Sequence, residues 1–116
     1  MNVHYNLSYL EEISAGDKDF IADMLHDFVI NTPETILEIQ SFIDSGNYEE
    51  IYKLVHRFIP SFDYVGSENI KDQLRQIESF AKNSQNINKI SSIFDGIKTE
   101  SSNLCNLIKQ DFNILA

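Results

Sequence analysis

The sequence predicts an all-α fold, an antiparallel four-helix bundle preceded by a short N-terminal helix. Its 116 residues include only 4 Gly and 2 Pro, which favours long regular elements over the frequent turns of strand-rich folds. Apolar residues make up 42% of the chain, and they recur with the spacing of amphipathic helices almost throughout. The length fits one domain, so we expect residues 1–116 to form a single domain.

The first half of the chain predicts a short helix and then a long helical segment. The short helix is expected around Ser8 to Ile13, with Asp17 capping the long segment and Gly46 ending it. Pro33 interrupts the long segment. Either Thr32 caps a new helix with Pro33 at its first position, or one long helix is kinked there. The apolar stripe of this segment comprises Phe20, Ile21, Met24, Leu25, Phe28, Val29, Ile36, Ile39 and Ile43.

Three further helices are predicted in the second half. Asn47 and Glu50 match a capping box, in which Asn47 caps a helix and Glu50 reaches back to it. Val65-Gly66 ends that helix, and Ser67 is expected to cap the next one. A polar loop at 83–86 then precedes the last helix. The predicted core positions are Ile51, Leu54, Val55, Phe58, Phe62, Ile70, Leu74, Ile77, Ala81, Ile90, Ile93, Phe94, Ile97, Leu104, Leu107 and Ile108.

Charge and cysteine content narrow the function classes. The net charge of −9 disfavours binding to nucleic acid or to anionic membrane surfaces. The N-terminal sequence lacks the basic start and apolar run of a signal peptide, and no apolar stretch approaches the roughly 20 residues of a membrane span. The single Cys105 is expected to be a small buried hydrophobe in a reducing compartment. We therefore expect a cytoplasmic protein.

Common catalytic and metal-binding motifs are absent from the sequence. It contains no glycine-rich phosphate loop, Cys-x-x-Cys pair, His-Glu-x-x-His motif or Gly-x-Ser-x-Gly turn. It also lacks the Glu-x-x-His motifs of carboxylate-bridged metal sites in helical bundles. We therefore predict no bound metal or cofactor. Of the three histidines, His4 lies near the N-terminus, and His26 lies between two aspartates on an expected exposed face.

His56 is the candidate functional residue. It lies about 100° around its helix from the core residue Val55, at the edge of the apolar stripe. Its surroundings are unusually apolar for an exposed histidine, which is typical of a protein docking face. Position alone favours a boundary residue without a role. The candidate docking surface comprises Tyr52, Lys53, Arg57, Ile59 and Pro60.

The string around His56, LVHRFIPSFDYVG at 54–66, resembles the signature of histidine phosphotransfer (HPt) domains. In that family a helix carries Ala-His-x-Leu-Lys-Gly-Ser and ends shortly before a glycine. The segment 14–21, followed by Phe28, resembles the Gly-Asp-x-x-Phe opening of the family's long second helix. Gly46-Asn47-Tyr48 resembles its turn before the histidine helix, and 73–78 resembles its following helix. The resemblance covers roughly residues 7 to 83.

The resemblance implies a phosphorelay intermediate with His56 as the phosphoacceptor. Such domains do not catalyse transfer alone, so the protein is not expected to be an enzyme. A response-regulator receiver domain would dock on the histidine face and supply both Mg²⁺ and the aspartate that exchanges the phosphoryl group. The implied partners are receiver domains and a hybrid sensor histidine kinase. Most members of the family are monomers, and we expect the same here.

Two positions depart from the family pattern. The family usually has lysine three residues and glycine four residues after the histidine, where this chain has Ile59 and Pro60. Lys53, on a neighbouring face of the helix, is a candidate to replace the charge of that lysine, and Arg57 is another whose direction is less suitable. Pro60 lacks the N–H that would bond to the carbonyl of His56, so we predict a kink or loosened turn there.

Two other functions remain open on sequence alone. A degenerate docking module would bind a receiver or kinase domain without being phosphorylated, and the absent lysine favours this alternative. A small bundle enzyme or metal carrier would need further ligands near His56, and the sequence shows no such set.

Overall fold

The structure is a computed structural model that describes residues 4–114. The ends of the predicted domain, 1–3 and 115–116, lie outside the described residues. Within residues 4–114 every regular element is a helix, which confirms the all-α prediction. The helices are α1 (Ser8–Ser14), α2 (Lys18–Asp44), α3 (Tyr48–Phe58), α4 (Ser61–Tyr64), α5 (Glu68–Lys82) and α6 (Ile87–Phe112).

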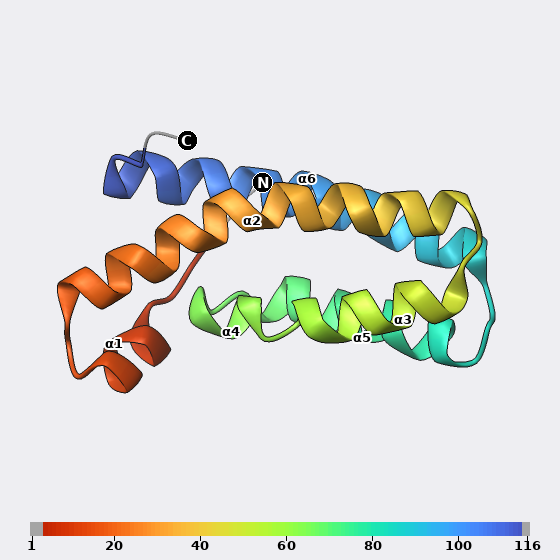
Figure 1. Cartoon of the computed structure of the whole chain (residues 1–116), viewed down its shortest axis with the longest axis horizontal. Helices are drawn as coiled ribbons and strands as arrows, with labels where there is room; N and C mark the ends of the chain where they lie inside the picture. Colours follow the sequence, from red (N-terminus) through yellow and green to blue (C-terminus); the bar gives the residue numbers. More distant parts are fainter. Residues whose placement is uncertain (1–3, 115–116) are drawn as a thin grey trace.

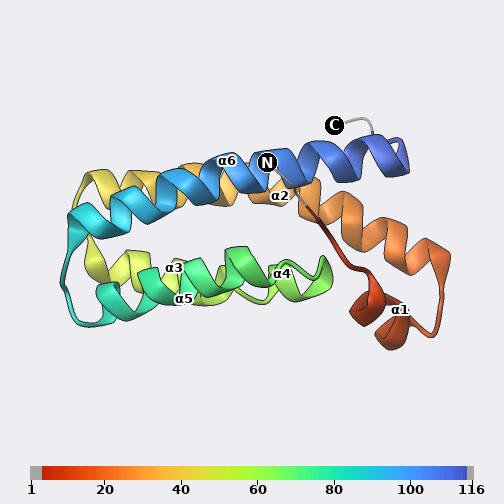
Figure 2. The ribbon, with the colours of Figure 1, turned by 180° about the vertical axis from the view of Figure 1, so that it is seen from behind.

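The four long helices form a bundle of two layers. Figures 1 and 2 show α2 beside α6 in one layer, with α3, α4 and α5 in the other. Helix α3 packs against α2 and α5, and α6 packs against α2 and α5, so the bundle closes on itself. The short α1 lies below the start of α2 and contacts α4. The predicted bundle with a short N-terminal helix is therefore confirmed.

Most of the predicted helix ends are confirmed. The Asp17 carboxylate accepts hydrogen bonds from the backbone N–H groups of Asp19 and Phe20 at the start of α2. The Asn47 side chain accepts one from the N–H of Glu50 at the start of α3. Ser67 occupies the N-cap position of α5, but its side chain makes no capping hydrogen bond, so that prediction was wrong.

Helix α2 continues through Pro33, which decides between the two arrangements left open by the sequence. The helix is unbroken from Lys18 to Asp44, although proline cannot donate the hydrogen bond that would reach the carbonyl of Val29. Figure 1 shows the first half of α2 inclined to its second half. We attribute this bend to the missing bond and to the bulk of the proline ring.

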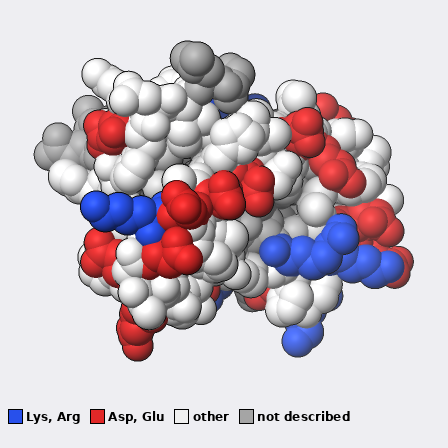
Figure 3. Space-filling view, turned by 60° about the vertical axis from the view of Figure 1, so that its left-hand side comes forward, with Lys and Arg blue, Asp and Glu red and all other residues white. Residues whose placement is uncertain are grey.

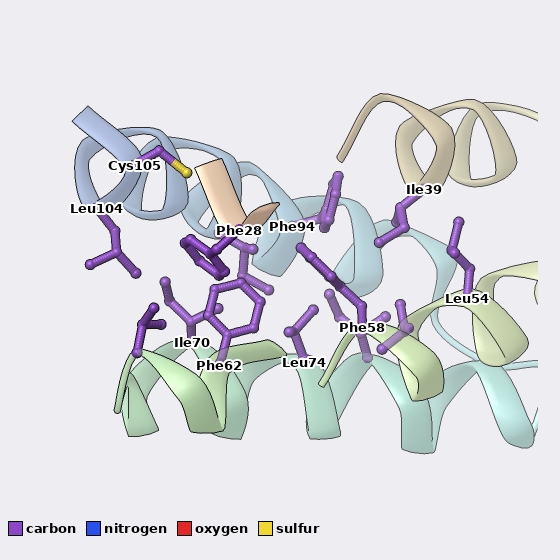
Figure 4. Packing of buried hydrophobic residues seen from close by; sticks show 14 of the residues in the cluster. Phe28, Ile39, Leu54, Phe58, Phe62, Ile70, Leu74, Phe94, Leu104 and Cys105 are labelled. Carbon is purple, nitrogen blue, oxygen red and sulfur yellow. The ribbon is translucent and has the colours of Figure 1, made fainter. Parts of the chain in front are cut away.

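The core is built around aromatic side chains that interlock between the layers. Phe62 is fully buried, and its ring meets Phe28 and Phe58 edge to face, with centroids 5.5 Å and 4.9 Å away (Figure 4). Of the predicted stripe in α2, Phe20 is 39% exposed. It lies in the first turn of α2, which extends beyond the other long helices (Figure 1).

Cys105 is buried in α6, as predicted. Desolvation by burial is the largest cause that raises the pKa of its thiol from 9.0 to about 11. Because the thiolate is the reactive form, we expect the folded protein at pH 8 to react with a disulfide reagent far more slowly than the chain unfolded in denaturant. The rate of thiol labelling under the two conditions checks this. Equal rates would show that Cys105 is accessible in the folded state.

Candidate functional site

Helix α3 presents His56 at the border between its buried and solvent faces. Ile51 and Val55 on the inner face are fully buried, whereas the imidazole of His56 is 67% exposed. The predicted position of His56 at the edge of the core stripe is therefore confirmed. Because α3 is packed on both α2 and α5, its backbone provides a firm base for the exposed ring.

Glu78 of α5 contacts the Nδ1 atom of the His56 imidazole. Its Oε2 atom lies 2.5 Å from Nδ1 of His56, and its side chain is 24% exposed. A carboxylate accepts a hydrogen bond, so in the neutral ring Nδ1 carries the proton and donates it. The lone pair then belongs to Nε2. This pairing leaves a nucleophilic nitrogen unblocked by Glu78.

Tyr52 stacks on the imidazole one turn earlier in α3. The two ring centroids are 5.9 Å apart, and the ring planes differ by 22°. The half-buried Tyr52 therefore contacts the imidazole in addition to Glu78. Both contacts favour the observed orientation of the ring.

The cations near His56 differ in availability. The ammonium of Lys53 lies 3.1 Å from Glu49 and 3.8 Å from Glu50. The hydrogen bond to Glu49 is the main cause that raises the Lys53 pKa. These contacts draw Lys53 toward the start of α3, which argues against its replacing the family lysine. Arg57 is exposed and forms no ion pair within residues 4–114, so it becomes the better candidate.

The α-helical hydrogen bonding is interrupted immediately after the His56 turn. Helix α3 ends at Phe58 and α4 begins at Ser61. The N–H of Ile59 still donates to the carbonyl of Val55, four residues earlier. The N–H of Phe62 instead donates to the carbonyl of Ile59, only three residues earlier, as in a tighter 3₁₀ turn. The loosened turn expected from Pro60 is therefore confirmed. Ile59 is half-buried against the core, whereas Pro60 is exposed.

The five predicted docking residues lie on one short stretch around His56. Lys53, Arg57 and Pro60 are exposed, whereas Tyr52 and Ile59 are half-buried. Arg57 also lines a hollow of 170 Å³ between α3 and α2, together with Thr35, Leu54, Phe58 and Ser61. The stretch thus offers a partner mixed polar and apolar contacts next to the imidazole.

Sequence reasoning missed Glu78. The available signal was the Ile77-Glu78 pair, in which Glu78 directly follows a core position of α5 and therefore lies at the edge of the buried face. Nothing in the spacing showed that this edge meets His56, which is 22 positions earlier in the chain.

Two further features were sought in the described part of the chain, a metal-binding cluster and a membrane-spanning helix. Within residues 4–114 no cluster of three or more His, Cys, Asp or Glu side chains is arranged to hold a metal ion. None of the helices in that range has the length and apolar character needed to cross a membrane. Acidic side chains spread over the face seen in Figure 3, whereas basic ones occur in a few places, in keeping with the net charge of −9.

Comparisons of the chain with models of known protein families, with curated proteins and with solved structures found no match.

The contact with Glu78 leads to a spectroscopic prediction. In Glu78→Gln the amide group can donate to Nδ1 instead of accepting from it, so we expect the fraction of His56 protonated at Nε2 to rise. The ¹⁵N chemical shifts of the ring nitrogens measure this fraction. Glu68→Gln, on the exposed first turn of α5, is the control and should leave it unchanged. The same tautomer fraction in Glu78→Gln and wild type would contradict the assigned role of Glu78.

Proposed function

We propose that this protein is an HPt-like phosphorelay intermediate of the cytoplasm, which accepts and donates phosphoryl groups at Nε2 of His56. The observation that carries the proposal is the exposed imidazole whose Nδ1 atom is bound by the Glu78 carboxylate. The family resemblance of the surrounding sequence supports it independently. Response-regulator receiver domains and a hybrid sensor kinase are the corresponding partners.

The arrangement of the imidazole suits phosphoryl transfer. The Nε2 lone pair attacks the phosphorus of an aspartyl phosphate on the receiver, and the P–O bond to the aspartate breaks, so its carboxylate leaves. The ring gains positive charge as the N–P bond forms, and the Glu78 carboxylate at Nδ1 stabilises that charge. Such transfer depends mainly on positioning and charge stabilisation. The receiver supplies the Mg²⁺ that neutralises the phosphoryl oxygens.

One observation favours the docking module without phosphorylation as a second candidate. The family lysine is replaced by the half-buried Ile59, and Lys53 is engaged by two glutamates. A phosphoryl group on His56 would therefore have Arg57 as its nearest candidate cation in the sequence. Both functions use the same face, so binding alone does not separate them.

The experiment that separates them is phosphotransfer. The protein is mixed with purified phosphorylated receiver domains from the same genome, and the label on it is tested with acid and alkali. A relay intermediate gains phosphate that is labile in acid and stable in alkali, as expected of phosphohistidine. If several receivers bind the protein and none labels it, the relay is ruled out and the docking module stands.

Ile59→Lys tests whether the absent cation limits transfer. The lysine stem can cover the same apolar surface while its ammonium reaches solvent near the phosphoryl group. We expect transfer to speed up by about two- to fivefold, because an exposed charge pair contributes up to about 1 kcal/mol. Stopped-flow or rapid-quench transfer rates measure this, with Ile59→Met as the uncharged control. An unchanged rate would show that charge at this position is unimportant.

A further inference from the structure

The face of the bundle formed by α2 and α6 carries an apolar groove that the proposed function does not use. A hollow of 370 Å³ lies between the two helices, with Pro33, Ile36, Leu37 and Cys105 among its lining residues. Leu37 is 72% exposed, the highest value among the exposed large hydrophobic side chains. Ile30, two turns earlier on the same side of α2, is 37% exposed. Exposed apolar surface of this kind marks an interaction site.

Opposite charges flank this groove. On α2, Glu34 and Glu38 lie about 60° and 100° beyond Leu37 on the side away from the groove, and both are exposed. On α6, Lys98 and Lys109 line the other side. Lys98 contacts Gln40 and Asp95, while Lys109 forms no ion pair within residues 4–114. The apolar strip therefore runs between an acidic edge and a basic edge.

The acidic and basic edges lie at the same level along the bundle axis. Lys98 donates a hydrogen bond of 2.7 Å to Gln40 of α2, which places Lys98 near the level of Glu38. A two-fold rotation about an axis parallel to α2 would bring the acidic edge of one molecule onto the basic edge of a second at the same level. An axis across α2 would instead place acid against acid.

We infer that, contrary to the monomer expected from the family resemblance, a second copy of this chain covers the groove in a two-fold symmetric dimer. In it the two α2 helices run parallel, Leu37 of each copy packs on the groove of the other, and Glu38 faces Lys98 across both edges. A stable interface needs about 800 Å² per partner, a modest part of the 6778 Å² of surface. His56 and Glu78 lie on the opposite layer (Figures 1 and 2), so both copies keep that face free.

Sedimentation equilibrium over a wide concentration range tests the dimer without any phosphotransfer assay. We expect wild type to dimerise and Leu37→Glu to sediment as a monomer while keeping the helical content of wild type. Ile13→Glu, which changes an exposed isoleucine on α1, is the matched control and should dimerise as wild type does. A monomeric wild type, or a dimer that persists in Leu37→Glu, would overturn the inference.

Charge reversal tests the orientation of the two copies. Glu38→Lys and Lys98→Glu alone each place like charges at both edges of the homodimer, so each should raise the dimer Kd at least tenfold. Mixing the two variants places lysine opposite glutamate at both edges, and heterodimers of about wild-type strength should form. If the mixture dimerises no better than the separate variants, the proposed pairing is wrong.

Discussion

His56→Gln is expected to abolish phosphate acceptance from receiver domains. Glutamine can still hydrogen-bond to Glu78, but it has no nitrogen lone pair that can attack phosphorus. The side chain of His56 is 67% exposed, so the free energy of unfolding should change by no more than about 1 kcal/mol. Labelling of the variant by phosphorylated receivers, followed by gel and intact-mass analysis, measures the loss.

His26→Gln is the matched control for this experiment. His26 is also an exposed histidine on a long helix, but it lies between Asp23 and Asp27 of α2, and no carboxylate within residues 4–114 is hydrogen-bonded to it. We expect this variant to be labelled as wild type is. Phosphate retained by His56→Gln, or lost from His26→Gln, would show that the acceptor has been assigned to the wrong residue.

Phe62→Ala should have the largest effect on stability. Phe62 is fully buried and packs edge to face on two other rings. Its truncation removes these contacts and leaves a cavity, which costs about 3–5 kcal/mol in large-to-small core substitutions. Urea unfolding followed by circular dichroism measures the change.

The control for Phe62→Ala is Phe20→Ala, which removes a ring of the same size at a partly exposed position. That variant should lose much less stability than Phe62→Ala. If Phe62→Ala instead unfolds within about 1 kcal/mol of wild type, the aromatic cluster is not the centre of the core. The result also concerns the site, because Phe62 anchors α4 directly after the break at Pro60.

The fold was predictable because local signals agreed along most of the chain. Asp17 and Asn47 begin helices where their side chains can cap them, and the apolar period identified the buried faces of α3, α5 and α6. Whether the helix ends or only bends at Pro33 could not be predicted, because proline permits both a new helix and a kinked one. Only packing of both halves of α2 in the bundle selected the kinked helix.

The site was predictable only in part. The location of His56 follows from the helical period, and the break after it follows from the missing N–H of Pro60. The pairing of His56 with Glu78 depends on how α3 and α5 are rotated against each other, which periodicity in one helix does not determine. The pairing of Lys53 with Glu49 is predictable as an i, i+4 pair, but the sequence does not show whether that pair or a contact beside His56 holds the Lys53 ammonium.

The position of the phosphoryl group after transfer tests the proposed role of His56 most directly. Nuclear magnetic resonance of ¹⁵N-labelled protein phosphorylated by a receiver domain identifies the modified ring nitrogen. We predict phosphorus on Nε2 of His56, with Nδ1 still protonated and hydrogen-bonded to Glu78. Phosphate on Nδ1 of His56 or on another residue, or no phosphohistidine with any receiver that binds, would contradict phosphoryl transfer through Nε2 of His56.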